Sequence, residues 1–230
     1  MTQNSTKTAL LDAALPHVAF DGWTDAILTQ AAEATGVPPA EARALFPRGA
    51  IDLALAFHAR GDAAMQEAFA AADLSTMRYS EKIAHLVRLR LEAIEGEREA
   101  VRRAAALFAL PQNAPHGAAA IWGTADSIWS ALGDTSEDAN WYSKRATLSA
   151  VYSATLLYWL GDESEGHTAT WAFLDRRIEN VMQIEKLKGG LRSNPLTKPL
   201  MAGPEWLASR IHAPRKTPPA DMPGHIKTPN

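Results

Sequence analysis

The apolar residues of this chain recur every three or four positions, and no stretch alternates with a period of two. This spacing gathers apolar side chains on one face of an α-helix, so the pattern predicts an all-helical protein. The first helix is expected to end near Gly22, and Thr24 suits the N-cap of a second. Gly36 suits the left-handed position that ends this second helix.

A third short helix and several longer ones follow along the chain. Pro38 or Pro39 is expected in the first turn of the third helix, and Pro47 is expected to break it. The stripes of the later helices are longer, and one of them includes Arg90 among apolar residues. The last helix is predicted over residues 165–188, because two glycines follow it.

These elements divide the chain into three parts. Residues 6–59 form a head of short helices, residues 60–188 a larger helical body, and residues 189–230 a basic, Pro-rich tail. Within the tail, residues 204–211 are expected to form a short amphipathic helix. Basic residues near an anionic membrane contribute about 1 kcal/mol each. The residues expected to contact a membrane are therefore Leu200, Met201, Trp206, Leu207 and Ile211. The alternatives are that the tail is loose, folds back on the body, or covers a cavity with Trp206.

Composition and charge narrow the class of protein. A hydrophobic content of 47% and a charged content of 21% are typical of a soluble globular protein. The formal net charge of -3 argues against a dedicated polyanion binder, and the absence of cysteine excludes disulfides and thiolate zinc sites. No apolar run is long enough to span a membrane, and the N-terminus lacks the pattern of a secretion signal. We expect a mature cytoplasmic protein. Any membrane contact is expected to be peripheral and to involve the inner face of the cytoplasmic membrane.

The sequence offers no set of residues for catalysis. Its seven histidines are scattered, and HExxH, paired ExxH, GxSxG, P-loop and GxGxxG motifs are all absent. The glutamates and arginines between residues 88 and 103 are interpreted as a solvated, salt-bridged face. We therefore expect no catalytic residue, no metal, no cofactor and no enzymatic activity.

The first 60 residues resemble the head of TetR-type regulators, in the segments LLDAALPHVAFDGW, TDAILTQAAEATGV and PPAEARALFPRGAIDLA. The third helix of such a head enters the DNA groove, but here it offers only Arg43 and also carries Glu41. Residues 1–60 contain four basic and six acidic side chains. Because DNA affinity comes largely from cations that neutralise phosphates, we expect that nucleic-acid binding has been lost.

A second resemblance covers about residues 7–188. The segments GWTDAI, LFPRGAIDLALAFH, GDTSEDANWYSKRATLSAVYSATLLYWLGDES and TWAFLDRRIENVM are similar to a lipid-binding family of ubiquinone biosynthesis that has a TetR-like fold. This resemblance implies binding of polyprenyl quinone intermediates or other isoprenoid lipids. It also implies a partnership with the di-iron demethoxyubiquinone hydroxylase or other quinone-biosynthesis enzymes, and membrane attachment through a C-terminal helix. The tail here departs from the family's long final helix.

Two groups of site residues follow from the apolar stripes and from this resemblance. The expected walls of a lipid cavity are Leu107, Phe108, Ile121, Trp122, Ile128, Trp129, Leu148, Val151, Tyr152, Leu156, Trp171 and Leu174. The alternative is that these residues are ordinary packed core. The resemblance places the hydroxylase-binding surface at Trp141, Tyr142 and Arg145. The alternative there is that Trp141 packs inward while Arg145 pairs with a carboxylate.

The working hypothesis is a homodimeric lipid-binding accessory protein that presents a polyprenyl quinone to a hydroxylase. TetR-like bodies commonly pair through their last two helices, which here cover residues 140–160 and 165–188. The alternatives are a ligand-responsive TetR-type repressor, which a DNA-binding assay distinguishes, and a dimeric scaffold with a solid core.

Overall fold

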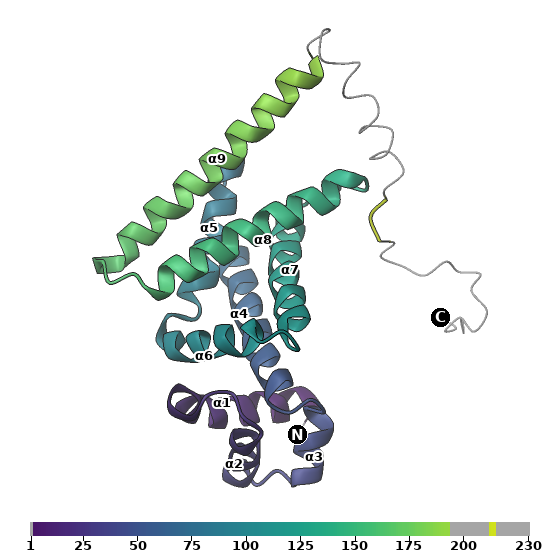
Figure 1. The fold of residues 1–230 in the computed structure, drawn as a ribbon, viewed down its shortest axis with the longest axis vertical. Coiled ribbons are helices and arrows are strands. Elements are labelled where there is room, and N and C mark those ends of the chain that lie inside the picture. Colours follow the sequence, from purple (N-terminus) through teal and green to yellow (C-terminus); the bar gives the residue numbers. More distant parts are fainter. Residues whose placement is uncertain (1, 194–211, 215–230) are drawn as a thin grey trace, which may run out of the picture.

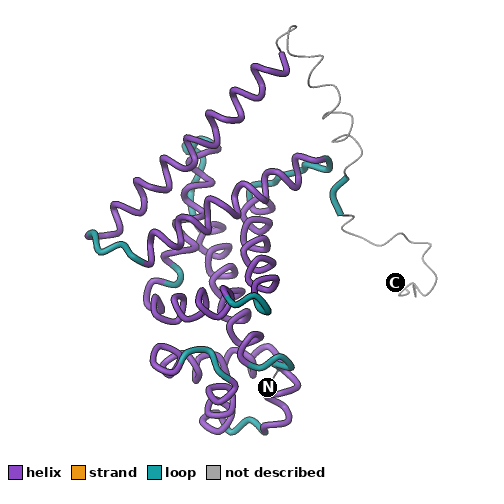
Figure 2. Tube along the Cα trace, viewed as in Figure 1, coloured by secondary structure: helices purple, strands orange, loops and turns teal. Residues whose placement is uncertain are grey.

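The computed structural model describes residues 2–193 and 212–214, without the side chains of residues 184–193 (Figure 1). Helices joined by short loops make up this part of the chain, and no strand occurs within it (Figure 2). The all-helical class predicted from the periodicity is therefore confirmed.

The head consists of α1 (Gln3–Asp21), α2 (Asp25–Thr35) and α3 (Pro39–Leu45). Local sequence sets their ends as expected. The Thr24 side chain accepts a hydrogen bond from the backbone of the first turn of α2, and Gly36 ends that helix in the left-handed conformation. The second helix thus begins and ends where its cap residues predict.

The body stacks longer helices above this head (Figure 1). In chain order these helices are α4 (Ala50–Ala71), α5 (Tyr79–Glu92), α6 (Arg98–Ala109), α7 (Ala114–Ala131), α8 (Ala139–Leu160) and α9 (Thr168–Ser193). The helix α4 rises from the head into the body without interruption at residues 59 and 60, where the sequence divides the two parts. In the body, α8 packs on α7, and α9 packs on α8 and α5.

One continuous apolar core joins the head to the body. Trp23, between α1 and α2, is buried and packs its ring against Phe57 of α4, with the ring centroids 5.4 Å apart. Its indole nitrogen donates a hydrogen bond to the carbonyl of Ala100 in α6, at 3.0 Å. Because a buried indole N–H is costly without a partner, this bond orients Trp23 between the two parts of the molecule.

The predicted end of the last helix at Gly189 and Gly190 is wrong, because α9 continues to Ser193. A glycine inside a helix costs only about 1 kcal/mol and keeps its backbone donor, so a glycine pair weakens a helix without ending it. The predicted helix at residues 204–211 and the expected membrane-contact residues from Leu200 to Ile211 lie outside the described residues. Across the described helices, none combines the length and apolar character needed to cross a bilayer.

Candidate functional site

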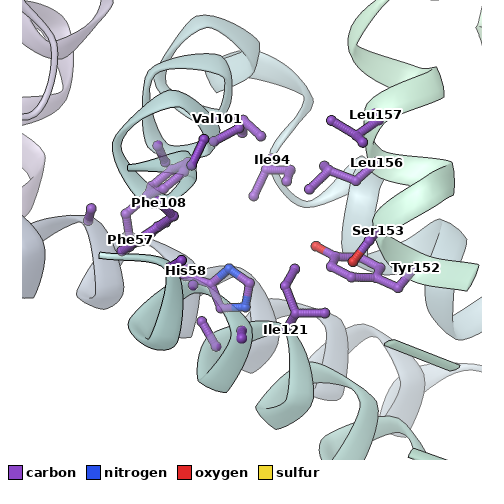
Figure 3. Close-up of a pocket in the computed structure, with 18 of the residues that line it drawn as sticks. Phe57, His58, Ile94, Val101, Phe108, Ile121, Tyr152, Ser153, Leu156 and Leu157 are labelled. Carbon is purple, nitrogen blue, oxygen red and sulfur yellow. The ribbon is translucent and has the colours of Figure 1, made fainter. Parts of the chain in front are cut away.

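A cavity of about 260 Å³ lies in the body between α4, α5, α6, α7 and α8. Its walls are mainly apolar, and Figure 3 shows Ile94, Val101, Phe108, Ile121 and Leu156 around it. The mouth is apolar as well, because Leu157 lines the cavity and is 65% exposed to solvent. The body therefore has an opening that suits an apolar ligand.

Small residues explain why the cavity exists at this place. Alanines of α6 and α7 line much of its wall and leave space that larger side chains would fill. Gly117 lets α7 approach α6 closely, since a Cβ atom at this position would lie 2.6 Å from the Cβ of Phe108. The alanine-rich segments of α6 and α7 thus set the shape of the cavity.

The inner end of the cavity carries a group of polar side chains. Arg90 of α5 is only 1% exposed. Its Nε donates to Asp62 at 2.6 Å, and its Nη2 donates to the carbonyl of His58 at 2.9 Å. The hydroxyl of Thr124 donates to the same carboxylate at 2.9 Å and lies 2.8 Å from Nε2 of His58. We call Asp62, His58, Arg90, Thr124 and Tyr152 the polar cluster.

Burial controls ionisation in this cluster. Desolvation, assisted by the charge of Arg90, lowers the pKa of His58 to about 4, so the ring is neutral at pH 7. Desolvation also raises the pKa of Tyr152, although the charge of Arg90 acts in the opposite direction. Burial alone would lower the pKa of Arg90, but its interactions with Tyr152 and Asp62 raise it. At neutral pH the cluster therefore contains one cation, Arg90, beside one carboxylate, Asp62.

The predicted lipid-contact residues divide among three environments. Phe108, Ile121, Tyr152 and Leu156 line the main cavity. A second cavity of about 170 Å³, between α5, α7, α8 and α9, is lined in part by Trp129, Leu148 and Val151. The residues that line neither cavity are Leu107, Trp122, Ile128, Trp171 and Leu174. Of these, Ile128 and Leu174 are buried in the packed core.

Sequence reasoning missed the polar side of the cavity. Arg90 falls in an apolar stripe, and reading it as part of a solvated, charged face is wrong, because its guanidinium is buried against Asp62. An arginine at an inward position of an amphipathic helix was the available signal. The contribution of α4 had no such signal, because His58 and Asp62 acquire their partners only when α5 and α7 pack against them.

A second feature is an aromatic surface at the start of α8, made by Trp122, Trp141 and Tyr142. The rings of Trp141 and Tyr142 meet edge to face with centroids 4.7 Å apart, and Trp122 of α7 lies 5.9 Å from Trp141. Tyr142 is 36% exposed, while Trp122 and Trp141 are half-buried. This surface thus presents aromatic rings to solvent from a firmly packed base.

Arg145 lies beneath this surface and not on it. It is 1% exposed, its Nε donates to Asp126 at 2.6 Å, and its Nη1 donates to Asp134 at 3.2 Å. Its guanidinium also stacks 4.0 Å from the ring centroid of Trp141. Burial alone would raise the pKa of the Asp134 carboxyl, but hydrogen bonds from Lys144, Ser136 and Arg145 hold it at about 2. Arg145 therefore orients Trp141, and a partner protein would not reach its charge.

The described piece of the tail returns to this same surface. The hydroxyl of Tyr142 donates to the carbonyl of His212 at 3.3 Å, and the backbone N–H of Ala213 donates to the carbonyl of Glu137 at 2.9 Å. Figure 1 shows this short segment beside the first turns of α8. Residues 212–214 thus lie at the edge of the aromatic surface.

The head does not present a free cation on its third helix. Arg43, in α3, lies 3.6 Å from a carboxylate oxygen of Asp25. Arg48, just after α3, makes a 2.6 Å ion pair with Asp52. Each of these arginines thus has an acidic neighbour, which reduces the local positive charge that a phosphate would meet. Within the described residues, no group of three or more histidines and carboxylates is arranged to hold a metal ion.

Comparisons with known proteins point to one family. Residues 114–185 match the model of the COQ9 family, and this segment includes α7, α8 and most of α9. The chain is 33% identical over 185 residues to the ubiquinone biosynthesis protein COQ9, mitochondrial, of Drosophila melanogaster, covering 79% of this chain and 56% of the fly protein. It is 30% identical over 185 residues to the coq9 protein of Schizosaccharomyces pombe, covering 79% of this chain and 72% of that protein.

A solved structure shows the same fold. The TetR transcriptional regulator from Nitrosomonas europaea superposes with a TM-score of 0.61 at 23% identity, covering 76% of this chain and 97% of the regulator. The TetR-like fold expected from the sequence is therefore confirmed. The chain spans little more than half the length of several of its COQ9 relatives. With the match to the S. pombe protein over most of both lengths, this chain belongs to the COQ9 family.

Proposed function

We propose that this chain is a lipid-binding accessory protein of ubiquinone biosynthesis and not itself an enzyme. Relatives of the chain are named as ubiquinone biosynthesis proteins. The observation that carries the proposal is the apolar cavity of about 260 Å³ inside a TetR-like body. In this proposal the cavity binds a polyprenyl quinone intermediate or another isoprenoid lipid, and the chain presents that lipid to a demethoxyubiquinone hydroxylase.

Apolar burial provides the binding energy that this function requires. Each CH₂ group transferred from water into an apolar site contributes about 0.8 kcal/mol. Leu156 and Leu157 on α8 and Phe108 on α6 supply such a surface from the mouth inward. Native mass spectrometry of the purified chain tests the proposal directly. A mass increment that matches an isoprenoid lipid supports it, and a chain that stays empty after incubation with short-chain quinones contradicts it.

The aromatic surface at the start of α8 is the proposed contact with the hydroxylase. Tryptophan and tyrosine are enriched among residues that dominate binding between proteins. Tyr142 is exposed here, and Arg145 fixes Trp141 from behind. The family match at residues 114–185 includes this surface.

Aromatic substitutions test this contact by co-purification with the hydroxylase. The double variant Trp141→Ala and Tyr142→Ala is expected to abolish the complex. The single variant Tyr142→Ala leaves the Trp141–Arg145 stacking in place and is expected to weaken the complex at least tenfold. Phe20→Ala is the control, because Phe20 is an exposed aromatic residue in the head. Unchanged co-purification of both α8 variants, with their helical content intact, would refute this surface.

Three further parts of the proposal concern assembly and location. A homodimer is proposed through α8 and α9, where Tyr158 and Phe173 stack with centroids 4.6 Å apart. Sedimentation equilibrium tests it, and a monomer at micromolar concentration contradicts it. A cytoplasmic location with weak membrane contact by the tail remains a prediction. Vesicle flotation of the chain with and without residues 200–211 tests the contact.

The second candidate function is that of a ligand-responsive repressor, and the likeness to the N. europaea regulator favours it. The pairing of Arg43 with Asp25 argues against it. A mobility-shift titration at low salt distinguishes the two. Sequence-selective DNA binding whose affinity falls steeply with salt would support the repressor.

A further inference from the structure

The cavity has an apolar mouth and a polar inner end. Arg90 and Tyr152 are each 1% exposed, whereas Leu157 at the mouth is 65% exposed. Figure 3 shows the hydroxyl of Tyr152 directed toward the middle of the cavity, with Ile94 and Ile121 on either side. A ligand that enters past Leu157 therefore meets the buried polar groups of Arg90 and Tyr152 at its leading end, with Ser153 beside Tyr152.

At this inner end one atom is buried without a partner, and one hydroxyl faces the cavity. Among the described residues, no hydrogen bond is made by the Tyr152 hydroxyl, and Nη1 of Arg90 is buried without an acceptor. Buried polar groups in proteins are nearly always satisfied, because an unpaired donor loses its hydrogen bonds to water. A phenylalanine would fill the same space as Tyr152 without this cost. The hydroxyl is thus poised to donate to an acceptor that the ligand supplies.

The charges of the cluster favour an uncharged ligand. Arg90 is the cation, and Asp62 compensates it through a 2.6 Å bond. The His58 ring is neutral at pH 7. An anionic head, such as a carboxylate or a phosphate, would compete with Asp62 for Arg90 and would be buried with a surplus negative charge. A carbonyl or ether oxygen meets no such penalty.

The size of the cavity limits how much of a lipid can enter, and its polar inner end favours the ring. An apolar cavity of about 150 Å³ is enough to hold benzene. The present volume of about 260 Å³ therefore suits a substituted six-membered ring. It is too small for a polyprenyl tail of many isoprene units in addition to that ring.

We propose that the cavity takes an uncharged, oxygen-bearing ring head-first, with the Tyr152 hydroxyl donating to a ring oxygen and the tail leaving past Leu157. This inference rests on the proposed lipid-binding function and specifies its ligand. Tyr152 is a specificity-determining residue in this arrangement, and the Arg90–Asp62 pair excludes anionic lipids.

Three probes with a ten-carbon chain separate the contributions of the ring oxygens, the apolar ring and a negative charge. They are a dimethoxy-methyl-benzoquinone, an alkylbenzene without oxygen, and decanoate. Titration calorimetry of the full chain is expected to show the quinone binding about three- to tenfold more tightly than the alkylbenzene, the range of one hydrogen bond. Decanoate is expected to bind most weakly. Extending the quinone tail from two to four isoprene units is expected to change the affinity less than threefold, because the added units lie outside the cavity.

The variant Tyr152→Phe is the decisive test. It is expected to remove the preference for the quinone over the alkylbenzene while raising the melting temperature of the ligand-free chain. A merely structural role for the hydroxyl would not give these opposite effects. Tyr142→Phe is the matched control, because the Tyr142 hydroxyl lies outside the cavity and donates to the carbonyl of His212 at the aromatic surface.

The outcomes separate this inference from the function on which it rests. Failure of all three probes to bind contradicts lipid binding itself. Equal binding of the quinone and the alkylbenzene, with no effect of Tyr152→Phe, leaves lipid binding intact and overturns the head-first orientation. Tightest binding of decanoate, or affinity that rises steadily with tail length, overturns it as well.

Discussion

Acid should destabilise this protein through His58. The ring lies between α4 and α7 with Nε2 2.8 Å from the Thr124 hydroxyl, and burial lowers the pKa of His58 from 6.5 to about 4. The folded state therefore keeps the ring neutral at a pH where the unfolded chain takes up a proton. The contribution of His58 to stability is complete above pH 6.5, falls as the pH drops, and is fully lost below about pH 4.

The size of the effect follows from the two pKa values. The full shift corresponds to about 3 kcal/mol, of which about 2 kcal/mol is lost by pH 5. Urea unfolding, followed by circular dichroism at pH 7.5, 6.5, 5.5 and 5.0, measures it. His58→Gln is the control, because glutamine retains hydrogen-bonding groups without titrating. Asp134 does not interfere with this measurement. Its pKa is lowered from 3.8 to about 2 in the folded chain, so its contribution to stability is lost only below pH 5.

The comparison between the two chains isolates His58 from all other titrating groups. The wild type is expected to lose about 2 kcal/mol more than His58→Gln between pH 7.5 and pH 5. A difference of less than about 0.5 kcal/mol between the two stability curves would be well below that expected for one buried group. It would mean that the ring titrates alike in the folded and unfolded chains. The description of a buried, neutral histidine would then be wrong.

Two pairs of substitutions test the packing around Arg90 and around Arg145. Gly61→Ala should lower the free energy of unfolding by about 2–3 kcal/mol, because its Cβ would lie 2.3 Å from Nη1 of Arg90 and displace the buried ion pair. Gly123→Ala in α7 meets no atom within 4 Å and should instead stabilise by up to about 1 kcal/mol, so calorimetric melting of both variants checks the reasoning. Asp134→Asn should cost about 3 kcal/mol in urea unfolding at pH 7, because Asp134 is 3% exposed beside the buried Arg145. Asp126→Asn should cost much less, since Asp126 is 45% exposed, and equal losses would contradict this ranking.

The helices were largely predictable because their signals are local. The N-cap at Thr24 and the left-handed Gly36 depend on residues within one or two turns, and the structure confirms both. The exception is the pair Gly189–Gly190, which predicts a helix end although α9 continues to Ser193. Only the side chains and backbone of near neighbours decide such features, so one sequence is enough to find them.

The site was less predictable because it depends on contacts between distant helices. A cavity is the difference between the space that the helices enclose and the volume of the side chains within it. The apolar stripes that predict Phe108 and Ile121 at its wall also predict Ile128, which lies in packed core. Arg145 shows the same difficulty, since its burial depends on Asp126 and Asp134 in the preceding helix and loop.

The geometry of α8 places the two parts of the proposed function within reach of one partner. Tyr142 and Leu157 are fifteen positions apart on this helix, which corresponds to about 22 Å along its axis and to sides that differ by only about 60°. A protein interface of ordinary size covers about 800 Å² on each partner, roughly 28 Å across. A hydroxylase interface with Tyr142 at one edge would therefore extend to the mouth beside Leu157. In the proposed complex, a ring held head-first at Tyr152 would leave through a mouth that the enzyme covers, so the lipid would pass between the two proteins without crossing water.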